Sequence, residues 1–157
     1  MPHTGAPRLL RKIAFMEGDW DVVMHVKPEP QGDWIKTTGT SSFRFILDRC
    51  VLEQVYEGVI SGSPFRGKGF FAFNRFSGKW QHVWSDNVAA NINVFVGDFD
   101  EGKLVVCGEE ESPGGKIFTR ATTFNISDDA FDWILESSAD GEAWTPIMKA
   151  TYSRKKS

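Results

Sequence analysis

The chain has 157 residues, with 18 Lys and Arg against 21 Asp and Glu, so its formal net charge is -3. This length suits one domain with a sizeable core, which we place over residues 1–157. The mild acidity disfavours nucleic acid as a partner, because such binders normally carry a basic face or stripe. The basic cluster Arg154-Lys155-Lys156 is best explained as a solvated terminus.

The start of the chain is polar, and no apolar run reaches the 18 or so residues that a membrane span needs. We therefore expect no signal peptide and no membrane partner, which makes the cytoplasm the default location. Cys50 and Cys107 lie far apart, in no metal-like spacing, and are expected to be reduced thiols. The three histidines, His3, His25 and His82, form no cluster at ligand spacing, so we expect neither a metal nor another cofactor.

Aromatic residues are abundant: 13 Phe, 6 Trp and 2 Tyr make up 13% of the chain, which also has 15 Gly. This mixture suits short, twisted strands joined by tight turns. One early stretch, residues 7–17, predicts a helix, with Pro7 well placed in its first turn. Its apolar side, with spacings of three and four, consists of Leu9, Leu10, Ile13 and Met16. A single short helix ahead of a β pattern suggests a lid or a plug.

Ten strand-like runs follow, separated by nine turn-forming sequences. The runs are residues 19–27, 34–47, 50–59, 65–74, 79–86, 91–98, 103–110, 116–126, 130–137 and 144–154. Short connections that join strands in order are typical of an all-β, up-and-down antiparallel barrel or a sandwich, not of a parallel α/β sheet. Phe70, Phe71 and Phe73 fall on both faces of one run, so an outward face could support a weak homodimer.

The run Lys79–Asp86 carries the main functional signal. In a strand, its period of two puts Trp80, His82, Trp84 and Asp86 on one face. Two indoles, an imidazole and a carboxylate together suggest the wall of a mostly apolar cavity that has a few orienting groups. In the alternative interpretation, Asp86 caps the turn that follows and Trp84 is ordinary core.

Other strands leave their inward faces less certain. We predict Gln54 and Tyr56 inward, because that sends Glu53 and Glu57 to water, although the opposite register would bury two valines. Arg120 shares a face with Phe118 and Phe124. If that face is inward, the interior holds a charge that needs a partner; the opposite register, with Arg120 in solvent, is equally open.

Gly18-Asp19-Trp20, at the head of the first strand, resembles the Gly-x-Trp motif of lipocalin-like (calycin) barrels. Those barrels also carry an Arg near the end of the last strand, and Arg154 stands there in this chain. The resemblance implies a barrel of about ten strands over residues 19–154, with Trp20 and Arg154 as a pair at its floor. A guanidinium across an indole would stabilise that floor by a cation–π contact.

The chain more closely resembles an uncharacterised bacterial lipocalin-like family that is known only as a domain of unknown function. The matching blocks are Leu52 to Gly58, Pro64 to Gly69, Trp84-Ser85-Asp86 and Thr151 to Lys155. The chain departs from the family pattern at Leu10, Asp48-Arg49, Ala72-Phe73-Asn74 and Trp80, and several of these departures remove polar or ionisable groups. The resemblance implies a barrel and a pocket but no settled activity.

We predict that the barrel binds a small, mainly apolar or aromatic molecule. The predicted ligand-binding residues are Trp84, Asp86, His82, Tyr56, Gln54, Arg120 and Phe73. An alternative is a small cofactor-free isomerase, cyclase or lyase that uses Tyr56, Asp86 and Arg120 as acid–base and anchoring groups. A third possibility is a barrel filled by its own side chains that acts only through its surface.

Overall fold

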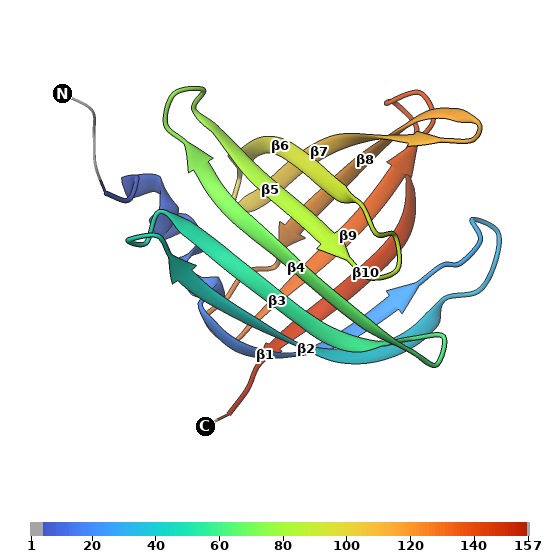
Figure 1. Cartoon of the computed structure of the whole chain (residues 1–157), viewed down its shortest axis with the longest axis horizontal. Coiled ribbons are helices and arrows are strands. Elements are labelled where there is room, and N and C mark those ends of the chain that lie inside the picture. The colour runs from blue at the N-terminus through green and yellow to red at the C-terminus, as the bar shows by residue number, and fades with distance from the viewer. Residues whose placement is uncertain (1–4, 157) are drawn as a thin grey trace.

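The computed structural model describes residues 5–156, and over this range the chain folds into one closed barrel of ten antiparallel strands (Figure 1). The strands are β1 (Gly18–Val26), β2 (Ile35–Ile46), β3 (Val51–Ile60), β4 (Ser63–Asn74), β5 (Lys79–Asp86), β6 (Ile92–Asp100), β7 (Lys103–Ser112), β8 (Gly115–Phe124), β9 (Ala130–Ser138) and β10 (Thr145–Arg154). Each pairs with the strands before and after it, and β1 closes the barrel against β10. The up-and-down barrel prediction is confirmed. His3 lies outside the described residues.

The predicted helix is a 3-10 helix, η1 (Arg8–Met16), rather than an α-helix. A 3-10 helix has three residues per turn, so the apolar residues spaced by three, Leu10, Ile13 and Met16, share its buried side. Leu9 was predicted on that side but is 43% exposed. Pro7 precedes the helix and accepts a 3.1 Å hydrogen bond from the Leu10 amide. No helix in residues 5–156 combines the length and hydropathy required to cross a bilayer.

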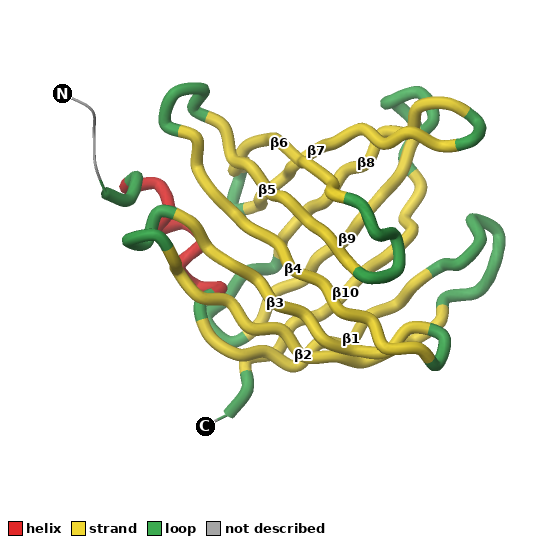
Figure 2. Tube along the Cα trace, in the orientation of Figure 1, coloured by secondary structure: helices red, strands yellow, loops and turns green. Residues whose placement is uncertain are grey.

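The helix lies at one end of the barrel, which we call the floor end (Figure 2). Because the strands run up and down in turn, alternate connections lie at the same end. The floor end carries the β2–β3, β4–β5, β6–β7 and β8–β9 turns, and the opposite, mouth end carries the other five connections. The helix runs into β1 at Gly18, at the floor. Of the two predicted roles, lid or plug, its position fits a plug.

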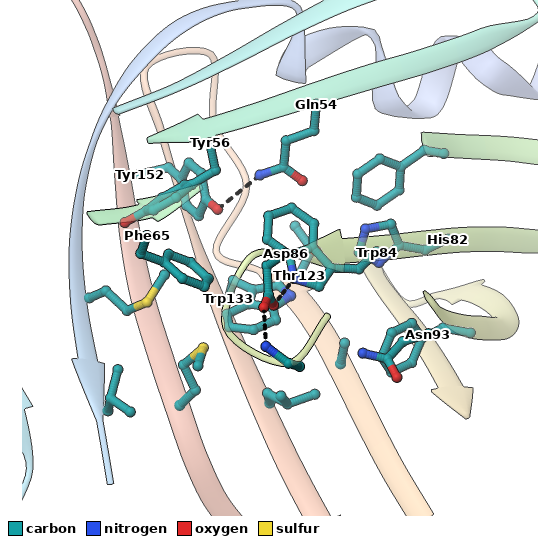
Figure 3. Close-up of a pocket in the computed structure, with 18 of the residues that line it drawn as sticks. Gln54, Tyr56, Phe65, His82, Trp84, Asp86, Asn93, Thr123, Trp133 and Tyr152 are labelled. Carbon is teal, nitrogen blue, oxygen red and sulfur yellow. Dashed lines mark hydrogen bonds between the residues drawn. The ribbon is translucent and has the colours of Figure 1, made fainter. Parts of the chain in front are cut away.

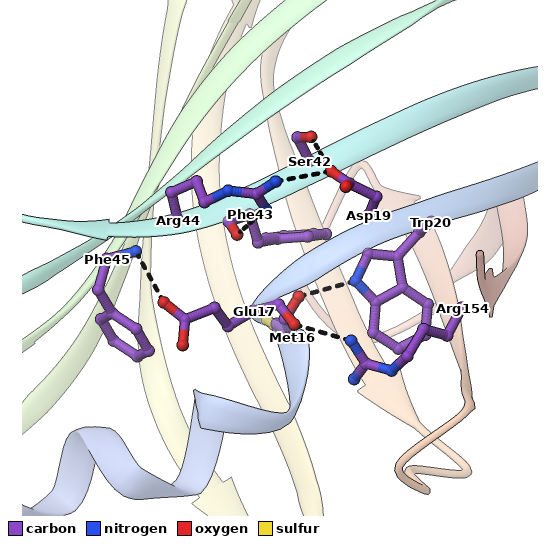
Figure 4. Close-up of polar contacts among 9 residues, drawn as sticks. All are labelled: Met16, Glu17, Asp19, Trp20, Ser42, Phe43, Arg44, Phe45 and Arg154. Atoms are coloured by element: carbon purple, nitrogen blue, oxygen red, sulfur yellow. Dashed lines mark hydrogen bonds and ion pairs between the residues drawn. The ribbon is translucent and has the colours of Figure 1, made fainter. Parts of the chain in front are cut away.

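Trp20 and Arg154 form the floor pair that the resemblance implied (Figure 4). The Arg154 guanidinium carbon lies 4.3 Å from the Trp20 ring centroid. Arg154 also donates hydrogen bonds to three backbone carbonyls, those of Phe15 (2.6 Å), Glu17 (2.8 Å) and Asp128 (2.7 Å). The Trp20 indole donates to the Met16 carbonyl at 2.7 Å. These bonds join the helix, β1 and the β8–β9 turn.

Gly18 is required at this junction for two reasons. Its φ of +128° is a conformation that residues with a side chain rarely adopt. A β-carbon there would also lie 2.6 Å from Nη1 of Arg154. The glycine of the Gly-x-Trp motif therefore makes room for the arginine that covers the tryptophan.

Aromatic side chains fill the floor half of the barrel. Trp80 packs edge-on against Phe73 and Phe99, with ring centroids 5.4 and 5.5 Å away. Trp20 packs against Phe131 at 4.8 Å. The filled-barrel interpretation therefore holds for this half only, and the cavity begins above it.

The outer wall leaves some apolar side chains in contact with solvent. Phe70 faces outward and is 37% exposed, and its register partner on β5 is Val83. Val83 in turn pairs with Val94 of β6, which is 52% exposed. The weak homodimer stays a prediction that sedimentation can check.

Candidate ligand-binding cavity

The mouth half of the barrel encloses a cavity of about 330 Å³. It extends from Met16, at the end of the helix, to Val88 and Ala89 in the β5–β6 loop. Its walls are mostly aromatic and aliphatic, and Figure 3 shows several of these side chains turned toward a common space. The volume lies at the lower end of the range of roughly 300–1,000 Å³ that is usual for small-molecule sites.

The inward face of β5 supplies three lining residues: His82, Trp84 and Asp86. Trp84 donates a 2.9 Å hydrogen bond from Nε1 to Oδ2 of Asp86. The other carboxylate oxygen accepts from the backbone amides of Val88 (2.9 Å) and Ala89 (2.8 Å). Asp86 therefore both lines the cavity and caps the turn, so the two sequence interpretations of this residue hold together.

The Trp84 ring lies against β4, where two glycines leave room for it. A β-carbon at Gly67 would lie 2.1 Å from Cζ2 of the indole, and one at Gly69 would lie 3.0 Å from its Cε3. With β4 behind the ring and Asp86 holding its nitrogen, the indole is fixed before any guest arrives. Because this wall is already ordered, little side-chain entropy is lost when a guest binds to it.

His82 stacks between two phenylalanines. Its ring is nearly parallel to that of Phe71, with centroids 4.0 Å apart, and lies 5.7 Å from that of Phe95. The residue is 6% exposed. Burial lowers the pKa of His82 to about 3, so the imidazole is neutral near neutral pH. Its Nε2 has no hydrogen-bond partner among the described residues.

Gln54 and Tyr56 both point inward, which confirms the predicted register of β3. Gln54 donates from Nε2 to Oγ of Ser41 at 3.1 Å and to the Tyr152 hydroxyl at 3.2 Å. Burial raises the pKa of Tyr56 to about 12 and also raises that of Tyr152. Both phenols therefore stay protonated near neutral pH and can serve as neutral hydrogen-bonding groups.

Two predicted ligand-binding residues do not line the cavity. Arg120 faces outward, where it donates to Oε1 of Glu136 at 3.1 and 3.0 Å and lies 4.3 Å from the Trp144 ring centroid. The inward prediction for Arg120 was therefore wrong. Phe73 points inward but packs on Trp80 below the cavity. It belongs to the filled floor half.

The alternative catalytic set is not assembled. With Arg120 outside, only Tyr56 and Asp86 remain, and they align on strands β3 and β5 with Gly67 of β4 between them. Neighbouring strands are about 4.8 Å apart, so the two Cα atoms are separated by about 10 Å. A tyrosine with a raised pKa is also a poor base, because almost none of it is ionised near neutral pH.

Seven aromatic lining residues were absent from the predicted site: Phe43, Phe65, Phe71, Phe95, Phe131, Trp133 and Tyr152. The sequence held a signal for three of them. In the run 130–137 the period of two puts Phe131, Trp133 and Leu135 on one face, opposite Asp132 and Ile134, and all three of the first set line the cavity. Tyr152 lies two positions before Arg154, so the period of two places it on the floor arginine's face.

This fold and this site define a closed antiparallel barrel with a preformed, largely apolar internal cavity. The chain belongs to the family described as "Protein of unknown function (DUF1579)", whose pattern matches residues 9–154. The expected membership of an uncharacterised family is confirmed. No match is found among curated proteins.

Several solved structures share the fold at low sequence identity. Rv2717c from M. tuberculosis is 14% identical, with a TM-score of 0.65 over 96% of this chain and 99% of its own. A redesigned β-barrel, mFAP1, bound to DFHBI, is 16% identical, with a TM-score of 0.51 over 92% and 99%. EF1p2_mFAP2b bound to DFHBI is 17% identical, with a TM-score of 0.51 over 92% and 98%. At these identities the likeness establishes the fold alone.

Proposed function

We propose that this protein binds a small, mainly apolar or aromatic molecule in the mouth half of its barrel, as a lipocalin-like binding protein. The observation that carries the proposal is the preformed cavity of about 330 Å³. A cavity of this size, with apolar walls and a few convergent polar groups, is what small-molecule recognition requires.

The rigidity of the aromatic wall also supports binding. Trp84 is held by Asp86 and backed by the glycines of β4, and His82 is stacked between two rings. Aromatic side chains give a large contact area with few rotatable bonds, so the protein loses little side-chain entropy when a guest binds.

The comparison structures are consistent with this function. Two redesigned barrels of similar fold are described as bound to the ligand DFHBI. Binding is placed ahead of catalysis because the acid–base set predicted for an enzyme does not converge, with Arg120 paired to Glu136 on the outer wall.

Native mass spectrometry of freshly purified protein tests the proposal. Ala121 lines the cavity, whereas its neighbour Thr122 points outward on the same strand. Ala121→Phe fills the cavity, and Thr122→Phe adds the same ring outside it. We expect a small-molecule adduct on the wild type and on Thr122→Phe, and none on Ala121→Phe. An adduct retained by Ala121→Phe, or no adduct on the wild type, counts against the proposal.

A further inference from the structure

One buried polar atom of the cavity wall has no hydrogen-bond partner in the part of the chain that the structure describes. Nε2 of His82 is buried and has no hydrogen-bond partner among residues 5–156, although His82 lines the cavity. The atom lies beside Gly69, where an inward-pointing β-carbon would be 3.3 Å away. The Val83 carbonyl oxygen, 2.6 Å from that β-carbon, is the first obstacle to a side chain at position 69, and such a side chain would also crowd the nitrogen.

A buried nitrogen without a hydrogen bond is unfavourable, and native proteins rarely tolerate one. The stack of Phe71, His82 and Phe95 would accept a phenylalanine in the middle position on grounds of shape. A histidine in that position therefore indicates a use for its nitrogen. Two other lining polar groups, Gln54 and Asp86, do not need a guest in the same way, because they already have partners in the protein.

The guest's polar group can be narrowed by the chemistry of a neutral imidazole. One ring nitrogen donates and the other accepts, and which one does so depends on the tautomer. A hydroxyl group both donates and accepts, so it can pair with Nε2 in either tautomer. An ether, a carbonyl or an N–H group pairs with only one tautomer.

The charges around the cavity narrow the guest further. The lining residues described by the structure include two carboxylates, Asp86 and Glu110, and no Lys or Arg. A carboxylate or sulfonate guest would lose its hydration in the cavity without gaining a cation, and the two acidic groups would repel it. The cavity therefore disfavours anions, including fatty acids.

The walls define the guest's shape. Trp84, Trp133, Tyr56 and Phe95 present rings to one small space. We propose that the ligand is a neutral, flat aromatic molecule of one or two rings whose hydroxyl group hydrogen bonds to Nε2 of His82. This inference rests on the proposed function and specifies the class of molecule that the same cavity takes.

Three probes of similar size test it by equilibrium dialysis at neutral pH. The probes are 2-naphthol, which is neutral and carries a hydroxyl, naphthalene, which lacks it, and 2-naphthoate, which is an anion. They are applied to the wild type, to His82→Phe and to Thr119→Val. The control Thr119→Val removes the Thr119 hydroxyl, which like Nε2 of His82 is buried without a partner among the described residues but does not line the cavity.

We expect the wild type and Thr119→Val to bind 2-naphthol about tenfold more tightly than naphthalene, the value of one desolvated hydrogen bond. In His82→Phe the ratio should fall to about one, with naphthalene binding retained. 2-Naphthoate should bind at least tenfold more weakly than 2-naphthol throughout. An unchanged ratio in His82→Phe, or tight binding of 2-naphthoate, overturns the inference.

A second measurement does not depend on a variant that folds. In the wild type, the Nε2 nitrogen NMR resonance of His82 should move on addition of 2-naphthol and stay in place with naphthalene. If naphthalene and 2-naphthol bind equally well and leave this resonance unchanged, water satisfies the nitrogen; the inference then fails while the proposed function stands. If neither probe binds the wild type, the inference is overturned as well. The proposed function fails separately, by the adduct test.

Discussion

The Trp84 indole donates its only hydrogen bond to Asp86, and the same carboxylate caps the β5–β6 turn at the mouth of the cavity. One side chain thus fixes both the aromatic wall and the loop next to it. The binding surface and the local fold depend on the same contact. Changes at Asp86 should therefore affect stability and binding together.

Asp86→Ala removes the partner of the Trp84 nitrogen and two caps of the turn. We expect the free energy of unfolding to fall by about 1–3 kcal/mol, because one half-buried indole N–H and two turn amides lose a charged acceptor. Urea unfolding measures this loss, and binding of the neutral two-ring dye Prodan should weaken in the same variant. The control is Asp98→Ala, which removes an exposed ion pair with Lys79 and should cost under about 1 kcal/mol.

Gly67→Ala should disturb the Trp84 ring directly. Its new β-carbon would overlap the indole from the strand behind it, and the ring could move away only by straining its hydrogen bond to Asp86. Overpacking of this kind costs about 1–3 kcal/mol. Thermal unfolding and the indole N–H resonance of Trp84 should both report the change. Gly114→Ala, at a site with nothing within 4 Å of the added carbon, should leave both unchanged; an equal effect there would contradict the account.

Arg154→Ala tests the floor of the barrel. The variant leaves three backbone carbonyls without their donor and removes the cation above Trp20. We expect a loss of about 3 kcal/mol in urea unfolding. Arg44→Ala breaks a half-exposed pair with Asp19 and should cost about 1 kcal/mol or less. Similar losses in the two variants would show that the floor pair has no special role.

His82 should make the folded protein sensitive to acid. Its pKa is about 3 in the folded state and 6.5 for an unperturbed histidine, so between these values the unfolded chain binds the extra proton. Stability should therefore fall as the pH drops below 6.5, by up to about 1.4 kcal/mol per pH unit from this group. His82→Phe should flatten that dependence, which urea unfolding at pH 4, 5, 6 and 7 can measure. A slope equal to that of the wild type would show that His82 is not buried in its neutral form.

Much of the fold follows from the period of two in the sequence. The run Lys79–Asp86 was predicted with the bounds that β5 has, and its inward residues lie on one face. The same rule placed Gln54 and Tyr56, because acidic neighbours on the other face prefer water. In these strands each face has a consistent chemical character, so the register can be read.

Strand β8 lacks that character. Three successive inward residues are small, Thr119, Ala121 and Thr123, whereas Phe118, Arg120 and Phe124 point outward. The β9–β10 loop covers this outer face: Trp144 stacks on Arg120, and Gly141 lies next to the Phe118 ring. A loop folded over the outer wall hides apolar side chains there, and strand periodicity gives no sign of it. The small inward residues in turn leave space for the cavity.

The boundary between filled and hollow barrel was also beyond the sequence. Phe73 and Trp84 are both inward aromatic residues, yet one packs in the floor and the other lines the cavity. Their heights along the barrel decide this, and heights depend on how ten tilted strands align. The missing hydrogen-bond partner of Nε2 in His82 likewise could not be predicted, because it depends on which residues surround the ring.

Prodan titration of the matched pair Ala121→Phe and Thr122→Phe decides whether the binding site lies inside the barrel. An interior site requires one bound dye per chain in the wild type and in Thr122→Phe, with the blue-shifted emission of an apolar environment. It also requires loss of that binding in Ala121→Phe, whose ring occupies the cavity. Equal binding by the two variants would contradict an interior site, as would the absence of binding by the wild type.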